Sequence, residues 1–231
     1  MTAKPRILVV DDEPQILRFL RPSLTAAGYD VATAGNATEA IKAIATTAPE
    51  LVILDLGLPD RDGKDVIAEV RAWSKVPIIV LSARDREAEK VAALDLGADD
   101  YINKPFGIGE LMARVRTALR HKIEDAHQVP VVRIRGLEID TIARTVRRDG
   151  EPIKLTPKEY DLLQVLVRNA GRVVTHRQVL AAVWGPAHTN DTQYLRVFVG
   201  QLRQKIEPDP ANPLLIATEP GVGYRFQSAE I

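Results

Sequence analysis

The sequence predicts two domains in succession: an α/β doubly wound domain with a five-stranded parallel sheet, followed by an α+β domain. Three observations favour this fold class. A chain of 231 residues is longer than one small core needs. From residue 6 to residue 122, short apolar runs alternate with segments of helical period, which is typical of a parallel sheet covered by helices. From residue 131 the pattern changes to short strands, three helices and a final strand pair. The predicted domains are therefore 1–121 and 131–231, with a polar linker at 122–130.

The first domain alternates strands and helices five times. Pro14 suits a first helical turn, Gly28 and Gly97 suit helix ends, and the Asp-Gly pair at 62–63 suits a turn. The predicted strands are 6–10, 29–34, 51–54, 77–81 and 100–102, and the predicted helices are 14–27, 37–47, 64–73, 87–96 and 108–120.

The second domain begins with four short strands and ends with a hairpin. The Asp-Gly pair at 149–150 marks a hairpin turn. Thr156 with Glu159 and Thr175 with Gln178 have the spacing of capping boxes, which predict the start of two helices. Antiparallel strands, three helices and a terminal hairpin together predict a winged helix-turn-helix. The predicted strands are 131–134, 137–140, 145–148, 153–155, 215–218 and 224–227, and the predicted helices are 160–169, 179–184 and 191–206.

The composition favours a globular protein without disulfides or thiolate metal sites. Hydrophobic residues make up 45% of the chain, charged residues make up 27%, and there is no cysteine. No apolar run approaches the roughly 18 residues that span a bilayer, and the N-terminus lacks a signal-peptide pattern, so we expect a cytoplasmic protein with no membrane association. From residue 130 onward, 14 Lys and Arg stand against 11 Asp and Glu, which weakly favours a polyanionic partner there.

Polar side chains follow the strands of the first domain. Asp11 and Asp12 follow the first strand, Asp55 the third, Ser82 the fourth and Lys104 the fifth. Ligands of doubly wound sheets bind outside the carboxyl ends of the strands, so these residues are expected to meet at one edge. Three carboxylates repel one another unless a hard cation such as Mg²⁺ neutralises them. Taken singly, the acids could simply cap a helix. Their order along the strands favours a shared site in which Asp55 attacks a phosphoryl group.

This set, together with Tyr101 and Pro105, resembles the receiver domain of bacterial two-component response regulators, which has a flavodoxin-like fold. The resemblance implies that a sensor histidine kinase phosphorylates Asp55. It also implies that Mg²⁺ is bound by Asp12, Asp55 and the backbone carbonyl of Gly57, and by Asp11 through water.

The resemblance assigns further roles around the phosphoryl group. Lys104 would contact this group through a cis peptide to Pro105. The Ser82 hydroxyl would donate to a phosphoryl oxygen, and the Tyr101 ring would rotate into the space that Ser82 leaves, so that phosphorylation changes the surface.

An aspartyl phosphohydrolase is a competing interpretation, because those enzymes also use a strand-end aspartate and Mg²⁺. They resemble one another in having a second acid two residues after the nucleophile. Here that position is Gly57, so no general acid is available there. We therefore expect a phosphoacceptor with slow self-dephosphorylation at most, and not an enzyme.

The third predicted helix of the second domain has two distinct faces. Its apolar residues recur at spacings of three and four, as in a helix that packs against a core. Its other faces carry amides and arginines, which suit base edges and phosphates in a DNA major groove, and Gly200 would permit close approach. The predicted core residues are Leu195, Val199, Leu202 and Ile206; the predicted DNA contacts are Gln193, Tyr194, Arg196, Val197, Gly200, Gln201, Arg203 and Gln204, with Arg225 in the terminal hairpin.

Several sequence runs in both domains resemble the OmpR/PhoB family of response regulators. Residues 155–160 and 221–226 resemble the signatures of its output domain. The remaining runs narrow the resemblance to regulators of potassium-transport operons; they are residues 54–60, 80–84, 104–111, 183–186 and 194–197. The implied partners are double-stranded DNA, a histidine kinase and RNA polymerase. The alternative is an output domain that binds protein instead of DNA.

The resemblance also implies a homodimer that forms on phosphorylation, through the face made by residues 87–120. Charged pairs would join Lys90 with Glu110 and Asp100 with Arg114. Asp99 would pair with His121, where the family usually has arginine, or with the neighbouring Arg120. The alternative is an ordinary solvated surface. Exposed pairs contribute only about 0.2–1 kcal/mol each, so they would set the register of the dimer more than drive it.

Overall fold

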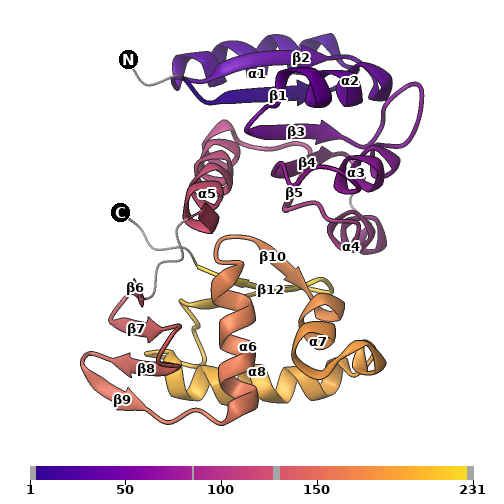
Figure 1. Ribbon diagram of the computed structural model, residues 1–231. Helices are drawn as coiled ribbons and strands as arrows, with labels where there is room; N and C mark the ends of the chain where they lie inside the picture. The colour runs from indigo at the N-terminus through magenta and orange to yellow at the C-terminus, as the bar shows by residue number, and fades with distance from the viewer. Residues whose placement is uncertain (1–3, 85, 127–130, 228–231) are drawn as a thin grey trace. The chain divides into compact units, whose positions relative to one another are not determined.

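The protein consists of two compact units, which we describe separately. The computed structural model (Figure 1) describes residues 4–84, 86–126 and 131–227. The first unit covers Met1–Ile123 and the second covers Glu124–Ile231. Both predicted folds are confirmed: a five-stranded parallel α/β unit comes first, and a winged helix-turn-helix unit follows it.

The first unit has one sheet whose strands all run parallel, in the order β2-β1-β3-β4-β5. The order reverses at β1 and β3, which are neighbours, so the carboxyl ends of these two strands border the crevice where doubly wound folds bind ligands. The strands are β1 (Arg6–Val10), β2 (Asp30–Ala34), β3 (Leu51–Asp55), β4 (Ile78–Ser82) and β5 (Asp100–Asn103).

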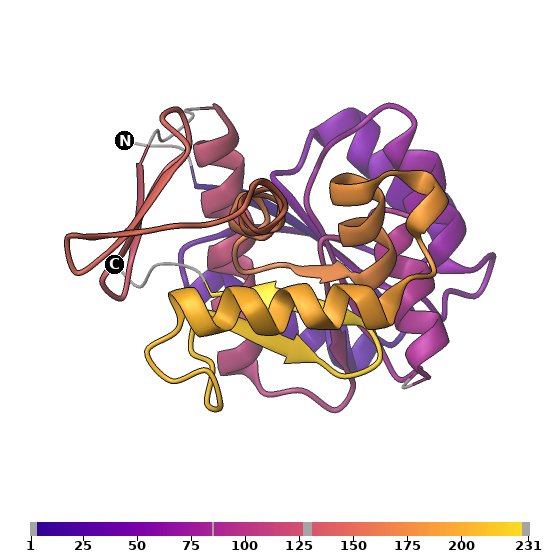
Figure 2. The same ribbon diagram turned by 90° about the horizontal axis from the view of Figure 1, so that it is seen from below.

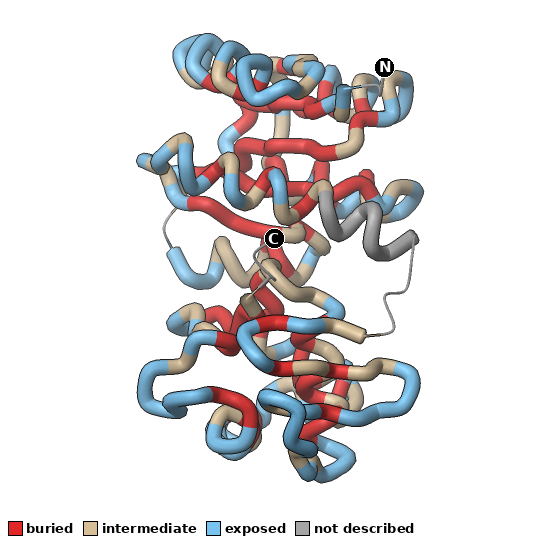
Figure 3. The backbone as a smooth tube through the Cα atoms, turned by 90° about the vertical axis from the view of Figure 1, so that its left-hand side faces the viewer, coloured by how far each residue is buried: buried red, intermediate tan, exposed pale blue. Residues whose placement is uncertain are grey.

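Helices cover both faces of this sheet. Leu20 and Leu24 of α1 and Leu111 and Val115 of α5 share one core with alternate strand residues such as Ile53. Both faces of the central strands are buried, which explains their continuous apolar sequence and the buried layer visible in Figure 3. The helices are α1 (Pro14–Ala26), α2 (Ala37–Thr47), α3 (Gly63–Arg71), α4 (Glu87–Asp95) and α5 (Ile108–Ala126).

The end of α5 differs from the sequence prediction. The helix was expected to stop at residue 120, but it continues to Ala126, inside the segment expected to be a linker. Residues 122–126 contain no glycine or proline, so nothing in their backbone chemistry ends a helix once it has formed. With 19 residues, α5 is the longest described helix. Neither it nor any other helix in the described ranges has the length and apolar composition to cross a bilayer.

The second unit has two antiparallel sheets around three helices. The first sheet has the order β6-β7-β8-β9 and the second has the order β10-β12-β11. Residues from both sheets and all three helices form one apolar core. The elements are β6 (Val131–Ile134), β7 (Leu137–Asp140), β8 (Thr145–Arg148), β9 (Glu151–Ile153), α6 (Pro157–Arg168), β10 (Val173–Thr175), α7 (His176–Trp184), a 3₁₀ turn (Pro186–His188), α8 (Thr192–Ile206), β11 (Ile216–Glu219) and β12 (Gly223–Phe226).

Local chemistry explains where these elements begin. Both predicted capping boxes are present, at Thr156 and at Thr175, and each begins its helix directly afterwards. Asp149 and Gly150 both have positive φ, 50° and 88°, which suits a two-residue hairpin turn. This turn pairs Arg148 with Glu151, so β9 begins earlier than the predicted residue 153. The sequence prediction missed β10, which is only three residues long.

Side chains fix the C-terminal half of α8 to its surroundings. The buried Glu207 carboxylate accepts hydrogen bonds from the backbone N–H groups of Leu214, Leu215 and Ile216 at 2.8–3.0 Å, which holds the start of β11 against the end of the helix. Lys205 Nζ lies 2.6 Å from Glu159 Oε2, which connects α8 to the first turn of α6. The helix is thus positioned by charged contacts as well as by its apolar face.

Candidate functional site

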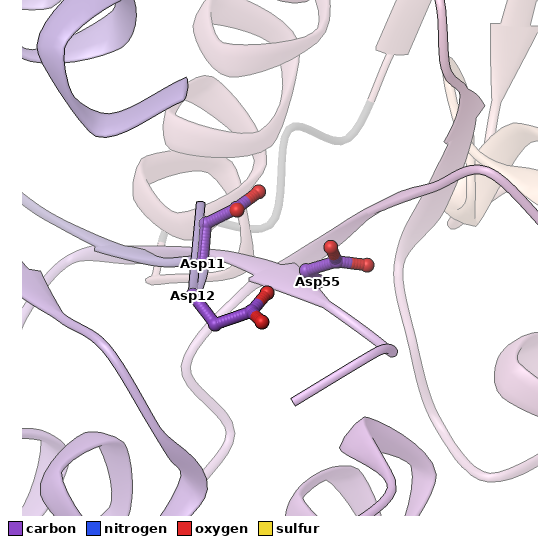
Figure 4. Close-up of side chains that lie close together, drawn as sticks. All are labelled: Asp11, Asp12 and Asp55. Atoms are coloured by element: carbon purple, nitrogen blue, oxygen red, sulfur yellow. The ribbon is translucent and has the colours of Figure 1, made fainter. Parts of the chain in front are cut away.

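Three carboxylates meet at the carboxyl edge of the parallel sheet (Figure 4). Asp11 and Asp12 directly follow β1 and Asp55 ends β3, and these two strands are paired neighbours. One oxygen of each carboxylate lies within 4.8 Å of the others. Asp11 and Asp55 are only 1% and 7% exposed, whereas Asp12 faces solvent. The predicted convergence of these residues is therefore present in the structure.

Lys104 completes this acidic group. Its Nζ lies 2.7 Å from Asp55 Oδ2 and 2.9 Å from Asp11 Oδ2, and Glu13 Oε1 lies 3.2 Å away. Burial alone would lower the pKa of the ammonium, but its hydrogen bonds to Asp55 and Asp11 outweigh burial and raise the pKa. Burial raises the pKa of Asp11, against the effect of its bond from Lys104. The peptide to Pro105 is cis, as predicted.

The donor set of this edge fits a hard divalent cation. All candidate ligands are oxygens, and three carboxylates with a single ammonium leave an excess of negative charge. Asp12 and Asp55 would bind Mg²⁺ directly, together with the Gly57 carbonyl, and Asp11 would act through water. The Gly57 N–H donates to Asp55 Oδ1 at 3.2 Å, which keeps the loop after β3 close to this carboxylate.

The predicted switch residues lie beside the acidic group. Ser82 ends β4 and is 1% exposed. The Tyr101 ring is also buried, at 2% exposed, and its hydroxyl donates to the backbone carbonyl of Arg84 at 2.6 Å. Of the two ring positions that the switch prediction describes, the structure therefore has the buried one.

Gly63 supports the site, although the sequence showed it only as part of a turn. A Cβ atom at this position would lie 2.5 Å from the Asp55 carbonyl oxygen and 2.8 Å from Leu56 Cα. The start of α3 is therefore packed directly against the backbone of the candidate nucleophile, and only glycine fits there.

Asp60 is a second supporting residue that sequence reasoning missed. Its carboxylate accepts hydrogen bonds from the N–H groups of Ala37 and Thr38 at 2.8 and 3.0 Å and from the Thr38 hydroxyl at 2.9 Å. These bonds join the loop after Asp55 to the start of α2. They lower the pKa of Asp60 to about 2, the bond from Ala37 first. The Leu-Pro-Asp sequence at 58–60 contains no local signal for this long-range cap.

We expect the Asp60→Asn substitution to lower the melting temperature in a pH-dependent way. The folded-state pKa of Asp60 is below its unfolded value of 3.8, so its stabilising contribution is present above about pH 4 and is lost as the pH falls through 2. The difference in melting temperature between the natural protein and the variant should be constant from pH 7 to 5 and narrow below pH 4. Asp65→Asn, at an exposed position of α3, is the control. A difference that does not depend on pH would contradict this role of the charge.

Several charged residues of the expected dimer face form ion pairs inside a single copy of the first unit. Arg114 contacts Asp100 at 2.8 Å and Glu110 at 2.9 Å. Asp99 Oδ2 accepts from the Arg71 guanidinium at 2.9 Å and from the Ile78 N–H at 2.7 Å, so it has a structural role that the sequence analysis did not foresee. Lys90 lies half-buried on α4. The predicted contributions of Arg120 and His121 fall outside the described side chains.

The two faces of α8 are arranged as predicted, and Figure 2 shows this helix along its whole length. Leu195, Val199, Leu202 and Ile206 are all at most 1% exposed. Most of the predicted DNA contacts lie on the exposed face: Gln193, Tyr194, Arg196, Val197, Gly200, Gln201 and Gln204. The Tyr194 ring packs against Trp184 and Phe198 at centroid distances of 5.5 and 4.8 Å. Trp184 is thus a packing residue that steadies the start of the helix.

Two arginines differ from the expected arrangement. Arg203 directs one guanidinium nitrogen at the Ile216 carbonyl, 2.6 Å away, and at Thr218 Oγ1, 2.8 Å away, so it joins α8 to β11. Arg225 is 8% exposed and contacts Glu219 Oε1 at 3.0 Å and the Gly171 carbonyl at 2.6 Å. The sequence did not indicate these contacts, because the acceptors of both arginines come from other segments of the chain. Arg196 is the arginine of this group that the structure leaves exposed.

Comparisons with known proteins agree with both halves of this description. The family model of the response regulator receiver domain matches residues 7–116. The model described as "Transcriptional regulatory protein, C terminal" matches residues 150–226. The acidic edge and the exposed face of α8 therefore lie in domains of two known kinds.

Curated relatives align with this chain over nearly its whole length. The KDP operon transcriptional regulatory protein KdpE of Escherichia coli is 50% identical over 220 residues, which is 95% of this chain and 98% of that protein. The transcriptional regulatory protein KdpE of Mycobacterium tuberculosis is 48% identical over 223 residues, with 96% and 99% covered. The crystal structure of DrrB, an OmpR/PhoB homologue from Thermotoga maritima, matches with a TM-score of 0.52 at 29% identity and covers 98% of this chain and 100% of that one. The chain belongs to the DNA-binding response regulators of the OmpR/PhoB type and is close to KdpE.

Proposed function

We propose that a KdpD-like sensor histidine kinase phosphorylates Asp55, and that the phosphorylated protein dimerises and regulates transcription of a potassium-transport operon in the cytoplasm. The observation that carries the proposal is the convergence of three carboxylates and Lys104 at one sheet edge. The similarity to KdpE over nearly the whole chain supports the choice of operon.

The geometry suits phosphoryl transfer to Asp55. An Asp55 oxygen forms the new bond to phosphorus, the bond from phosphorus to the donor nitrogen of the kinase histidine breaks, and that nitrogen keeps the electron pair. Lys104 remains beside the transferred oxygens and balances their charge. Bound Mg²⁺ would supply further charge neutralisation on these oxygens. Gly57 stands where a phosphohydrolase has its second acid, which supports slow self-dephosphorylation and a non-enzymatic role.

The output side of the proposal rests on α8. Two phosphorylated copies would pair through the α4, β5 and α5 face, with Lys90, Glu110, Asp100 and Arg114 among the contacts, and would place two α8 helices on adjacent half-sites of duplex DNA. The DNA-bound dimer would then act on transcription through RNA polymerase.

We expect duplex binding to fall steeply with salt, because Lys and Arg contacts to phosphate release counterions. Arg196→Ala should weaken binding to all duplexes to a similar degree and reduce the slope of log affinity against log salt by about one, because it removes one phosphate contact. Lys42→Ala, at an exposed position of α2 in the other unit, removes the same charge and should leave the slope unchanged.

Gel shifts of the phosphorylated full chain at several ionic strengths provide the measurement, and a footprint on promoters of the source genome would identify the operator. An output domain that binds protein predicts little duplex binding at any salt concentration. That result would overturn the DNA-binding part of the proposal.

A further inference from the structure

Arg84 lies in the loop after β4 and connects three parts of the first unit. Its guanidinium contacts Asp62 Oδ2 at 2.6 Å, in the loop before α3, and Glu89 Oε2 at 3.2 Å, in the first turn of α4. Lys64 Nζ shares Glu89 at 2.9 Å and lies 4.0 Å from Asp62. These four side chains are between 23% and 37% exposed, so the network is partly shielded from water. The loop after β4 is therefore held between two helices by ion pairs.

The backbone of the same residue holds the switch tyrosine. The Arg84 carbonyl accepts the hydrogen bond from the buried Tyr101 hydroxyl at 2.6 Å. The Ser82 side chain is also within hydrogen-bond reach of this hydroxyl, but the carbonyl is the acceptor of the Tyr101 proton. A buried donor without an acceptor is costly, so moving this carbonyl away would destabilise the buried ring. The ion pairs of the Arg84 side chain fix the loop that carries the carbonyl.

The network also reaches the phosphorylation site. Asp62 accepts from the Lys64 N–H at 2.9 Å and so begins α3, whose first residue, Gly63, packs against the Asp55 carbonyl. Arg84 also directs a nitrogen at the Leu56 carbonyl, 3.4 Å away and one residue after Asp55. Asp55, Arg84 and Tyr101 thus belong to one contiguous set of contacts.

We infer that Arg84 is a positioning residue of the switch, whose ion pairs with Asp62 and Glu89 hold its carbonyl where it keeps Tyr101 buried. These contacts use neither oxygen of the Asp55 carboxylate, so they favour the buried ring independently of the chemistry at Asp55. The inference rests on the proposed function, because it assigns the control of the same switch. It predicts a receiver whose Tyr101 is largely buried before phosphorylation.

The test uses the full chain labelled with 3-fluorotyrosine, with the Tyr101 signal assigned by Tyr101→Phe. We expect natural protein to show mainly the buried signal without a phosphoryl donor. Arg84→Ala keeps the backbone carbonyl but removes both ion pairs, and it should shift the buried-to-exposed ratio of Tyr101 about three- to tenfold toward exposed. Arg84→Lys keeps a positive charge, so it should shift the ratio less than Arg84→Ala does. Glu89→Gln removes one of the two ion pairs, so it should give a smaller shift in the same direction.

Two controls match these variants in charge and place. Arg86→Ala removes an exposed neighbouring arginine, and Glu87→Gln removes an acid from the same helical turn as Glu89. Both should leave the Tyr101 signal unchanged. An unchanged signal in Arg84→Ala, an equal shift in Arg86→Ala, or a mainly exposed ring in natural protein would overturn the inference.

Labelling of the same samples by acetyl phosphate separates this result from the proposed function. If natural protein is labelled but Arg84→Ala leaves the Tyr101 signal unchanged, only the inference is refuted. Natural protein that cannot be labelled refutes the proposed function itself. Thermal melting of each variant shows that the unit is folded, and Glu89→Gln keeps the test decisive if Arg84→Ala does not fold.

Discussion

Replacing Asp55 with asparagine should abolish labelling of the protein by acetyl phosphate in the presence of Mg²⁺. Asparagine has nearly the same shape, and its side-chain oxygen can still accept from Lys104, so the edge of the sheet should keep its structure. It has no carboxylate oxygen that can form a stable bond to phosphorus, so the expected loss is complete. Incorporation of labelled phosphate into the full chain, or its mass increase, is the measurement.

Asp65→Asn provides a matched control, because it removes an exposed carboxylate from α3 close in sequence to the site. That variant should label as the natural protein does. Continued labelling of Asp55→Asn would show that another carboxylate is the acceptor, with Asp12 the first to test because it lies in the same group.

Replacing Gly223 with alanine should destabilise the second unit strongly. A Cβ atom there would overlap the Val174 carbonyl oxygen and lie 2.8 Å from Thr175 Cα, so it would collide with the backbone of the neighbouring β10. Backbone cannot move aside as a flexible side chain can, so we expect a loss of about 3 kcal/mol in the free energy of unfolding, at the upper end for an overpacked core. Denaturant titration of the full chain, followed by a signal from the second unit, measures this loss.

Gly200 offers the opposite expectation in the same unit. It lies on the exposed face of α8, and a Cβ atom there would meet nothing within 4 Å. Gly200→Ala should stabilise the unit by about 0.5–1 kcal/mol through helix propensity. Similar stability of the two variants would show that β10 and β12 are not packed as closely as the structure has them.

The fold and the acidic edge could be predicted because their signals are local and repeated. Continuous apolar runs such as 51–54 identify strands buried on both faces, and the polar residue after each run lies at the same edge by the geometry of parallel sheets. The capping boxes of α6 and α7 likewise have a signature within four residues. For such features the sequence contains the whole physical cause.

The remaining features depend on partners far away in the sequence. Nothing near Arg225 indicates that the Gly171 carbonyl accepts from it across 54 residues, and nothing near Asp60 points to the start of α2. The switch ring is a similar case, because the side chain of Tyr101 is apolar enough for burial but its acceptor is a loop carbonyl. The end of α5 was missed for a different reason: a polar segment without breakers can either continue a helix or leave it.

Glu207, Lys205 and Arg203 attach α8 to the rest of the second unit, and the predicted DNA contacts on the exposed face of the helix take no part in this attachment. The attached side of the helix contributes contacts that stabilise the unit, whereas Arg196 and Gln201 on the other side are exposed to solvent. Changes on that free side should alter which bases are preferred at little cost in folding, because the scaffold underneath does not depend on them. Substitutions at a few exposed positions of α8 could therefore change the operator that is recognised while the fold of the DNA-binding unit stays the same.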